Sequence, residues 1–180
     1  ASAVSHFPNH KRFDELEGIQ LMLIFIRRAM FCKRSALKII DYQLNNDPDM
    51  CSKFVNVLGL KTLFAAFMKK KRKKKSKKYS QSDTEDEEHI ISTIASLLLY
   101  TSGSDLQRVL HKFVEGNFVK IERLVELYEK NLNRTRIAEK QIYLLQQERH
   151  ATYEDYNPDE DEAEFHLLRL EAGLYALQKT

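Results

Sequence analysis

The stretch that decides the fold is ELEGIQLMLIFIRRAMF, residues 15–31. Two apolar stripes run along it at helical spacing, one formed by Leu16, Ile19, Leu23 and Ile26 and the other by Leu21, Ile24 and Phe25. A helix that is apolar on two sides has to be covered on both sides. The stretch therefore predicts a helix over about residues 15–31 that packs between neighbouring helices.

The rest of the chain has the composition of a helical protein. Among 180 residues there are only five Gly and three Pro, with 43% hydrophobic and 31% charged residues. Turn signals divide the sequence into about nine helical segments, and no segment shows the sustained alternation of a strand. Two-sided helices joined by short turns favour a stacked array, an all-α helical solenoid within a single domain, although no exact repeat is visible. A compact bundle is the alternative.

Local signals place several helix ends. In NDPDMCSKFVNVLG (residues 46–59), we expect Asp47 to cap a helix, Pro48 to be its first residue and Gly59 to end it. Another helix is expected from about Glu87 to Thr101. The segment after Asn117 predicts a helix with one apolar face, formed by Ile121, Leu124, Val125, Tyr128 and Leu132. A separate helix, RTRIAEKQIYLLQQERH, and a last helix opened by the carboxylates of residues 159–162 follow.

A charged block interrupts the pattern at MKKKRKKKSKKYSQSDTEDEE, residues 68–88. Its basic members are Lys69, Lys70, Lys71, Arg72, Lys73, Lys74, Lys75, Lys77 and Lys78. Residues 69–88 hold nine of the 29 basic and five of the 26 acidic residues, so the remainder, with 20 against 21, is nearly neutral. Residues 69–86 are too polar and too long for an ordinary connection, and a disordered insertion is predicted there.

The basic run has three interpretations. It can be a solvated loop, a nuclear import signal recognised by an import receptor, or a contact to the RNA or DNA backbone. Only Tyr79, at its edge, could stack on a base, which disfavours sequence-specific nucleic-acid binding. The nuclear signal is preferred, and direct nucleic-acid contact is kept as a secondary function.

The acidic part of the block suggests regulation of that signal. Ser80, Ser82 and Thr84 each have an acidic residue three positions further on, a pattern that acidophilic kinases accept. Phosphates at these positions would offset the lysines and could mask the signal.

Residues that carry chemistry are sparse. There is no Gly-rich phosphate loop, no nucleophile elbow and no HExxH, and the six His are scattered. We therefore expect no enzyme activity, no cofactor and no metal site. Cys32 and Cys51 are interpreted as inert thiols in a reducing compartment. The six apolar residues of LMLIFI are too few for a membrane span, so no membrane partner is expected.

Five segments, which follow one another in the same order, resemble the β-catenin-like protein 1 family of armadillo-repeat proteins. They are NHKRFDELEGIQLMLIFIR (9–27), SALKIIDYQL (35–44), KFVNVLGLKTLFAAFMK (53–69), EEHIISTIASLLL (87–99) and EFHLLRLEAGLYALQ (164–178). The resemblance implies an armadillo-type superhelix in a non-enzymatic nuclear protein. It also implies association with the spliceosome through the nineteen complex, binding of basic nuclear-localisation-type segments, and partners that include the Myb-like subunit of that complex and an antibody-diversifying cytidine deaminase.

The family's members are longer than this chain, which has no initiator Met and stops within a helical pattern, so a fragment of a longer protein is expected. No residue of the partner-binding groove can be assigned from the sequence. Glu122, Glu126 and Glu129 lie opposite the apolar stripe of their helix and could attract basic partners, but solvation explains them equally well.

Overall fold

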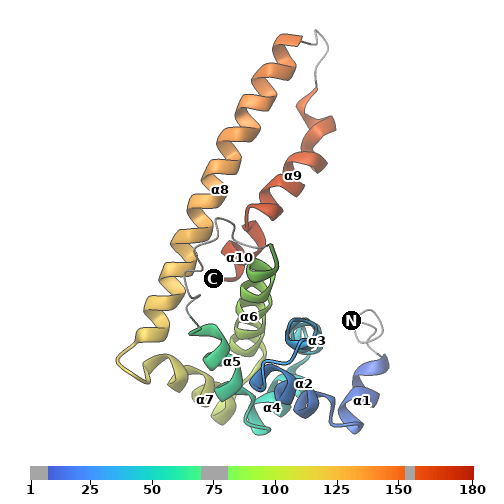
Figure 1. The fold of residues 1–180 in the computed structure, drawn as a ribbon, viewed down its shortest axis with the longest axis vertical. Coiled ribbons are helices and arrows are strands. Elements are labelled where there is room, and N and C mark those ends of the chain that lie inside the picture. The colour runs from blue at the N-terminus through green and yellow to red at the C-terminus, as the bar shows by residue number, and fades with distance from the viewer. Residues whose placement is uncertain (1–7, 70–80, 153–156) are drawn as a thin grey trace. The chain divides into compact units, whose positions relative to one another are not determined.

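The computed structural model describes residues 8–69, 81–152 and 157–180 (Figure 1). These residues form ten α-helices, one short 3-10 helix and no strand, which confirms the all-α class. The helices are α1 (Pro8–Glu15), α2 (Gly18–Arg27), α3 (Lys33–Leu44), α4 (Pro48–Asn56), α5 (Gly59–Phe67), α6 (Gln81–Tyr100), α7 (Gly103–Val114), α8 (Val119–Thr152), η1 (Pro158–Asp161), α9 (Glu162–Glu171) and α10 (Leu174–Lys179).

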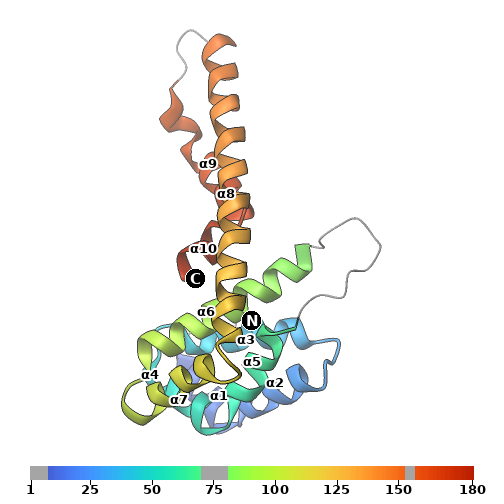
Figure 2. The ribbon, with the colours of Figure 1, turned by 90° about the vertical axis from the view of Figure 1, so that its left-hand side faces the viewer.

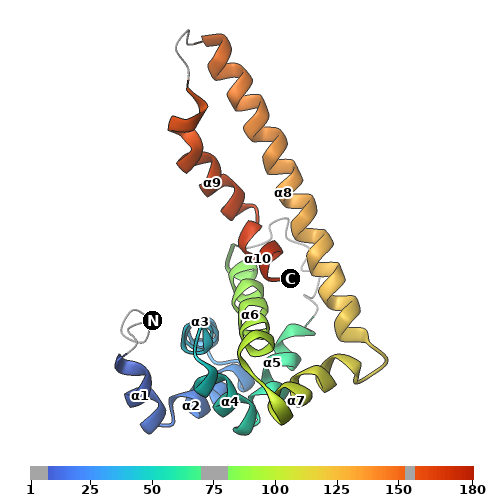
Figure 3. The same cartoon turned by 180° about the vertical axis from the view of Figure 1, so that it is seen from behind.

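The packing of the chain divides it into two compact units, Ala1–Glu122 and Arg123–Thr180. The sequence pattern did not predict this division. In the first unit, α2 packs against α3 and α5, and α3 packs against α6. Figures 2 and 3 both show α3 beside α6. The order α1–α2–α3 followed by α4–α5–α6 is that of two successive three-helix layers, and α7 packs on the second layer.

A spacing of 41 residues relates the two layers, and it is visible once the structure aligns them. Four buried side chains of α2 recur in α5: Ile19, Met22, Leu23 and Ile26 correspond to Leu60, Leu63, Phe64 and Phe67. Each helix also opens with a glycine that lies against a phenylalanine five residues earlier. An armadillo-type repeat has a period of roughly 40–47 residues. The two layers thus repeat the positions of their buried side chains and not the residues themselves, so no exact sequence repeat is visible.

The helix predicted over residues 15–31 is shorter in the structure, where α2 runs from Gly18 to Arg27, and a glycine explains where it begins. A Cβ on Gly18 would lie 2.4 Å from the Phe13 ring, and one on Gly59 would lie 2.6 Å from the Phe54 ring. The residues just before them, Glu17 and Leu58, have left-handed backbones with φ of 54° and 63°. The chain therefore turns between α1 and α2, and likewise between α4 and α5, which are bent by 91°.

The second turn also corrects the expected role of Gly59. Leu58 takes the left-handed position after α4, and Gly59 begins α5 because only a residue without a side chain fits against Phe54. The other end of α4 was predicted correctly. Asp47 precedes Pro48 and its Oδ1 accepts a hydrogen bond of 3.0 Å from the Met50 N–H.

Helix α6 begins at Gln81 rather than at about Glu87, so residues 81–86 of the predicted disordered insertion are helical. Residues 70–80 of that insertion lie outside the described residues. Carboxylates near the start of a helix are favoured by its dipole, and Asp86 is also held by two cations of α3. These contacts lie far away in the sequence, which is why the local pattern missed the extra turns.

In the second unit, one continuous helix replaces two predicted helices. No Gly or Pro interrupts residues 119–152, and α8 runs through them. Its buried positions are Arg123, Leu127, Asn131, Thr135, Ala138 and Ile142. The predicted apolar residues do share one face of α8, but this face is not the buried one, because Ile121, Val125 and Tyr128 are exposed.

Polar contacts hold α9 antiparallel to α8. Arg149 near the end of α8 binds Glu164 at 3.0 Å and also pairs with Asp161, whereas Arg169 near the end of α9 binds Glu139 at 2.8 Å. Phe165 is fully buried below the Arg149 guanidinium, which lies 5.6 Å from the ring centroid. The last predicted helix is split at Gly173, whose φ is 101°.

Candidate partner-binding surface

The structure places only part of the predicted charged site. Lys69 is exposed and follows α5, with its backbone N–H 3.2 Å from the Ala66 carbonyl. The basic residues 70–78 and the acceptor Ser80 lie outside the described residues. Ser82 belongs to the first turn of α6, and Thr84 lies half-buried one turn further on. The described part of the site is therefore the start of α6 and the helix beside it.

The acidic start of α6 is fixed to the start of α3. One Asp86 carboxylate oxygen accepts a hydrogen bond of 3.1 Å from Lys33 Nζ, and the other accepts one of 3.1 Å from Arg34 Nε. All three side chains are partly exposed, at 20–46%. The pairs position the first turns of α6 more than they stabilise the whole fold, since exposed ion pairs contribute little.

A second set of contacts continues the seam between α3 and α6. His89 Nδ1 lies 2.9 Å from the buried Asp41 carboxylate, and the His89 ring meets Tyr42 edge-on with centroids 6.2 Å apart. At the other end of the pair, the hydroxyl of Tyr100, the last residue of α6, donates to the side chain of Asn46, just after α3. Because starts meet starts and ends meet ends, α3 and α6 are parallel, as corresponding helices of two stacked layers should be.

The surface formed by the starts of α3 and α6 is charged. Its charges are mixed, with Lys33, Arg34 and Lys38 on α3 and Glu85 exposed on α6. Within the described ranges, no group of three His, Cys, Asp or Glu could hold a metal ion. Cys51 is buried, and burial raises the pKa of its thiol to about 12, so it is a poor nucleophile at neutral pH. None of the described helices alone is long and apolar enough to cross a membrane. Helices α4 and α5 together pass by length and composition only, and they are bent by 91°.

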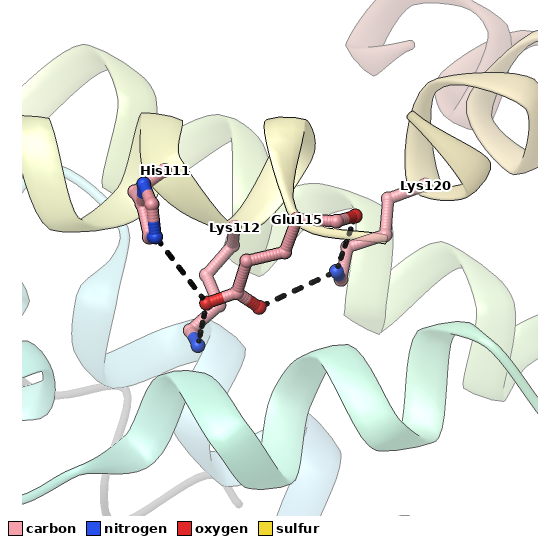
Figure 4. A network of polar contacts seen from close by, with 4 residues as sticks. All are labelled: His111, Lys112, Glu115 and Lys120. Atoms are coloured by element: carbon pink, nitrogen blue, oxygen red, sulfur yellow. Dashed lines mark hydrogen bonds and ion pairs between the residues drawn. The ribbon is translucent and has the colours of Figure 1, made fainter. Parts of the chain in front are cut away.

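The turn after α7 is held by a cluster of four charged side chains (Figure 4). Glu115 accepts a hydrogen bond of 2.7 Å from Lys112 and lies 3.5 Å from Lys120 and 3.9 Å from His111. The Lys112 hydrogen bond is the main cause that lowers the pKa of Glu115. The following residues Gly116, Asn117 and Phe118 all have positive φ, between 59° and 68°. The cluster thus bridges a sharply turning part of the backbone.

Several residues of this surface were not found from the sequence. Lys33, Arg34, Asp41 and His89 come together only because α3 packs on α6, across 48–53 positions of the chain. The sequence contains one sign of this pairing, which is the opposite charge of the residues on two amphipathic helices. Glu122, Glu126 and Glu129 are exposed, as predicted, and Glu126 pairs with Arg123 at 2.9 Å.

Repeated three-helix layers with parallel third helices define the class of protein: an armadillo-type helical array. A family described as "Catenin-beta-like, Arm-motif containing nuclear" matches residues 1–180. The chain belongs to this family, which confirms the resemblance and the armadillo-type fold.

Curated relatives carry the same family name. The chain is 40% identical to human "Beta-catenin-like protein 1" over 174 residues, which is 94% of this chain and 30% of that protein. The bovine protein of that name gives the same values. A "Beta-catenin-like protein 1 homolog" of Schizosaccharomyces pombe is 32% identical over 185 residues, covering 99% of this chain and 29% of that protein. The chain thus spans about three-tenths of the length of these relatives, and its family is a nuclear one.

Proposed function

We propose that this chain is part of a non-enzymatic nuclear scaffold that binds basic, nuclear-localisation-type segments of pre-mRNA splicing proteins. The partners would be proteins of the nineteen complex, including its Myb-like subunit. Membership of an Arm-motif containing nuclear family supports the scaffold role and the compartment. Helical arrays of this kind act through extended binding surfaces, which agrees with a role in recruiting partners.

The observation that carries the proposal is the ordered acidic start of α6. Asp86 fixes these turns to α3, Glu85 is exposed, and Glu87 and Glu88 are half-buried beside it. An array of stacked helices presents such carboxylates on a rigid frame, and a partner rich in Lys or Arg is attracted to them.

The test is a titration of the full chain with a fluorescent peptide that carries a Lys/Arg cluster. We expect Glu85→Lys to weaken binding about threefold to tenfold at low salt, because an attractive charge becomes repulsive. Glu148→Lys, at an exposed glutamate near the end of α8, is the matched control and should leave the affinity unchanged. Equal affinities of the two variants would contradict the proposal.

The chain's own basic run is a competitor that the experiment has to remove. The titration is therefore repeated after the nine basic residues from Lys69 to Lys78 are replaced by Ser. If the run competes with the peptide, the replaced chain binds more tightly. If the peptide does not bind either chain, the acidic start of α6 is not a receptor for basic segments.

The second candidate function is an accessory contact to RNA or DNA backbone through the basic run. Nine cations within ten positions are the observation that favours it. In filter binding, a steep dependence of affinity on salt that disappears in the Ser-replaced chain would support this function over the first.

A further inference from the structure

The most exposed large apolar side chain among the described residues is Phe31, at 99% of its full exposure. It lies in the turn between α2 and α3, in the sequence Arg27-Arg28-Ala29-Met30-Phe31-Cys32-Lys33-Arg34. Four cationic side chains flank the ring within this short turn. A single exposed apolar residue is common, but an exposed ring with four cations within four positions along the chain is a recognisable combination.

The backbone of this turn is fixed on both sides of Phe31. The Met30 N–H donates to the Phe25 carbonyl at 3.1 Å, and the Ala29 N–H donates to the Ile26 carbonyl at 3.1 Å. With Ala29 at φ 51°, this is the hydrogen-bond pattern of a Schellman motif closing α2. On the other side, the Lys33 N–H donates to the Met30 carbonyl at 2.9 Å. An ordered backbone therefore carries the ring, and little backbone entropy is lost when the ring is covered.

The cations are arranged to leave charge available for a ligand. Arg27 and Arg28 are exposed. Arg34 donates through Nε to Asp86, so this ion pair uses only one of its nitrogens, and its side chain is 46% exposed. The turn thus combines at least two exposed guanidinium groups with one exposed aromatic ring.

The repeat relates this turn to the basic run. The connection between the second and third helices is residues 28–32 in the first layer and 68–80 in the second, where the basic run begins at Lys69. The Asp86 pairs bring the first turns of α6 against the start of α3, so the helices that follow the two connections begin beside each other. In repeat proteins, such connections lie on one face of the array and often form the binding face.

We propose that the α2–α3 turn, formed by Arg27, Arg28, Phe31 and Arg34, is a contact site for single-stranded nucleic acid. Phe31 stacks on an unpaired base, and the arginines bind the flanking phosphates. The phosphates of a nucleic acid pair with the cations, and a flat base stacks on the ring. An acidic peptide offers negative charge but no base to stack on the ring. The site adjoins the acidic start of α6 through the Arg34–Asp86 pair, but it does not depend on the scaffold function proposed above.

The test measures binding of a fluorescent oligouridylate to the full chain over a series of salt concentrations. Phe31→Ala should weaken binding about tenfold with an unchanged salt slope, because stacking is not ionic. Arg27→Ser with Arg28→Ser should reduce the slope by about 0.7 for each phosphate that is no longer bound. Tyr143→Ala, which removes a ring that is 60% exposed on α8, and Arg136→Ser with Lys140→Ser are the matched controls and should change neither quantity.

The basic run could mask the effect, so each variant is also made in the chain whose run is replaced by Ser. Binding that persists there and falls with Phe31→Ala supports the site. If Phe31→Ala leaves the affinity unchanged in both chains, the proposed site is wrong and nucleic acid binds through the basic run alone. If only an acidic peptide binds in a Phe31-dependent manner, the ligand class is wrong. Thermal unfolding and basic-peptide affinity should be unchanged in Phe31→Ala, which separates this result from a failure of the scaffold proposal.

Discussion

Phe54 is fully buried, and its ring occupies the space that a Cβ on Gly59 would need. In the preceding layer Phe13 and Gly18 make the same contact, but the Phe13 ring is only half-buried and has more room to move. The two contacts let consecutive helices approach closely at a sharp turn. Their different burial makes the two glycines unequal.

We expect Gly59→Ala to lower the free energy of unfolding by about 1–3 kcal/mol, the usual cost of overpacking a core. Gly18→Ala should cost less, because Phe13 can turn aside. Alanine favours helices by about 1 kcal/mol over glycine, so the sign of the change reveals whether the clash dominates. Urea unfolding measures both variants. A stabilised Gly59→Ala variant would refute the clash. The clash would be supported if Gly59→Ala costs less stability in a chain that already carries Phe54→Leu than in the unchanged chain.

Cys51 is the second residue whose environment decides its chemistry. Its Sγ lies 3.3 Å from the Leu44 carbonyl oxygen in the core, and burial raises the pKa of the thiol to about 12 from its ordinary 9.0. At neutral pH we expect a thiol reagent to modify the half-buried Cys32 in the native chain and to reach Cys51 only after unfolding. A Cys32→Ala variant should therefore show no fast thiol. Rapid modification of that variant would contradict the assignment.

At the scale of the element, local signals predicted helix type better than helix ends. The Asp47–Pro48 start of α4 was predicted because its signal lies within four residues. The break before Gly18 was missed because it depends on the Phe13 ring, and the early start of α6 was missed because Asp86 is bound by α3, 52 and 53 positions away. The sequence located the charged block, but the helix that receives its acidic end could not be predicted from any local pattern.

The Asp86 contacts predict a local effect on α6. Asp86→Asn removes the charge that holds Lys33 and Arg34, and we expect a loss of only about 0.5–1 kcal/mol in stability because the pairs are partly exposed. The larger effect should be faster hydrogen exchange of the amides around residues 84–88. Glu85→Gln, at an exposed neighbouring position, serves as the control. Unchanged exchange in Asp86→Asn would show that the α3 contacts do not order these turns.

The turn between α7 and α8 should respond to pH through Glu115. Since its pKa is lowered in the folded chain from the ordinary 4.5, the ionised form stabilises folding above pH 4.5, and this contribution is lost as the pH falls through the lowered pKa. The difference in melting temperature between Glu115→Gln and the unchanged chain should therefore be present at pH 7 and vanish in acid. Raising the salt concentration should reduce it as well, because the Glu115 side chain is partly exposed. A difference that is independent of pH would assign the effect to packing.

At the scale of the whole molecule, charge and fold are separated along the chain. Nine of the 29 basic residues lie between Lys69 and Lys78, and the chain outside residues 69–88 has 20 basic and 21 acidic residues. The described helices have buried apolar side chains of their own outside residues 69–78. We therefore expect replacement of its nine cations by Ser to leave the helical content and the melting temperature nearly unchanged.

Nuclear entry should depend on the same residues if the run is an import signal. Fused to a carrier too large to diffuse through nuclear pores, the chain should accumulate in the nucleus, and the Ser-replaced chain should stay in the cytoplasm. Replacing Arg134, Arg136 and Lys140 of α8 by Ser is the matched control, because it removes cations that are not clustered. A replaced run that still supports import would leave the run as a solvated loop or a nucleic-acid contact.

The acidic neighbours add a graded version of this experiment. A chain with Ser80, Ser82 and Thr84 all changed to Glu gains three negative charges, at or just before the start of α6 and close to the basic run. If phosphates at these positions mask the signal, this chain should enter the nucleus more slowly than the unchanged chain, and a triple Ala variant should not. Because Thr84 is half-buried, a variant carrying only Ser80 and Ser82 as Glu separates masking from damage to the helix. Normal import of both Glu variants would mean that the acidic turns stabilise the contact between α3 and α6 and do not regulate the import signal.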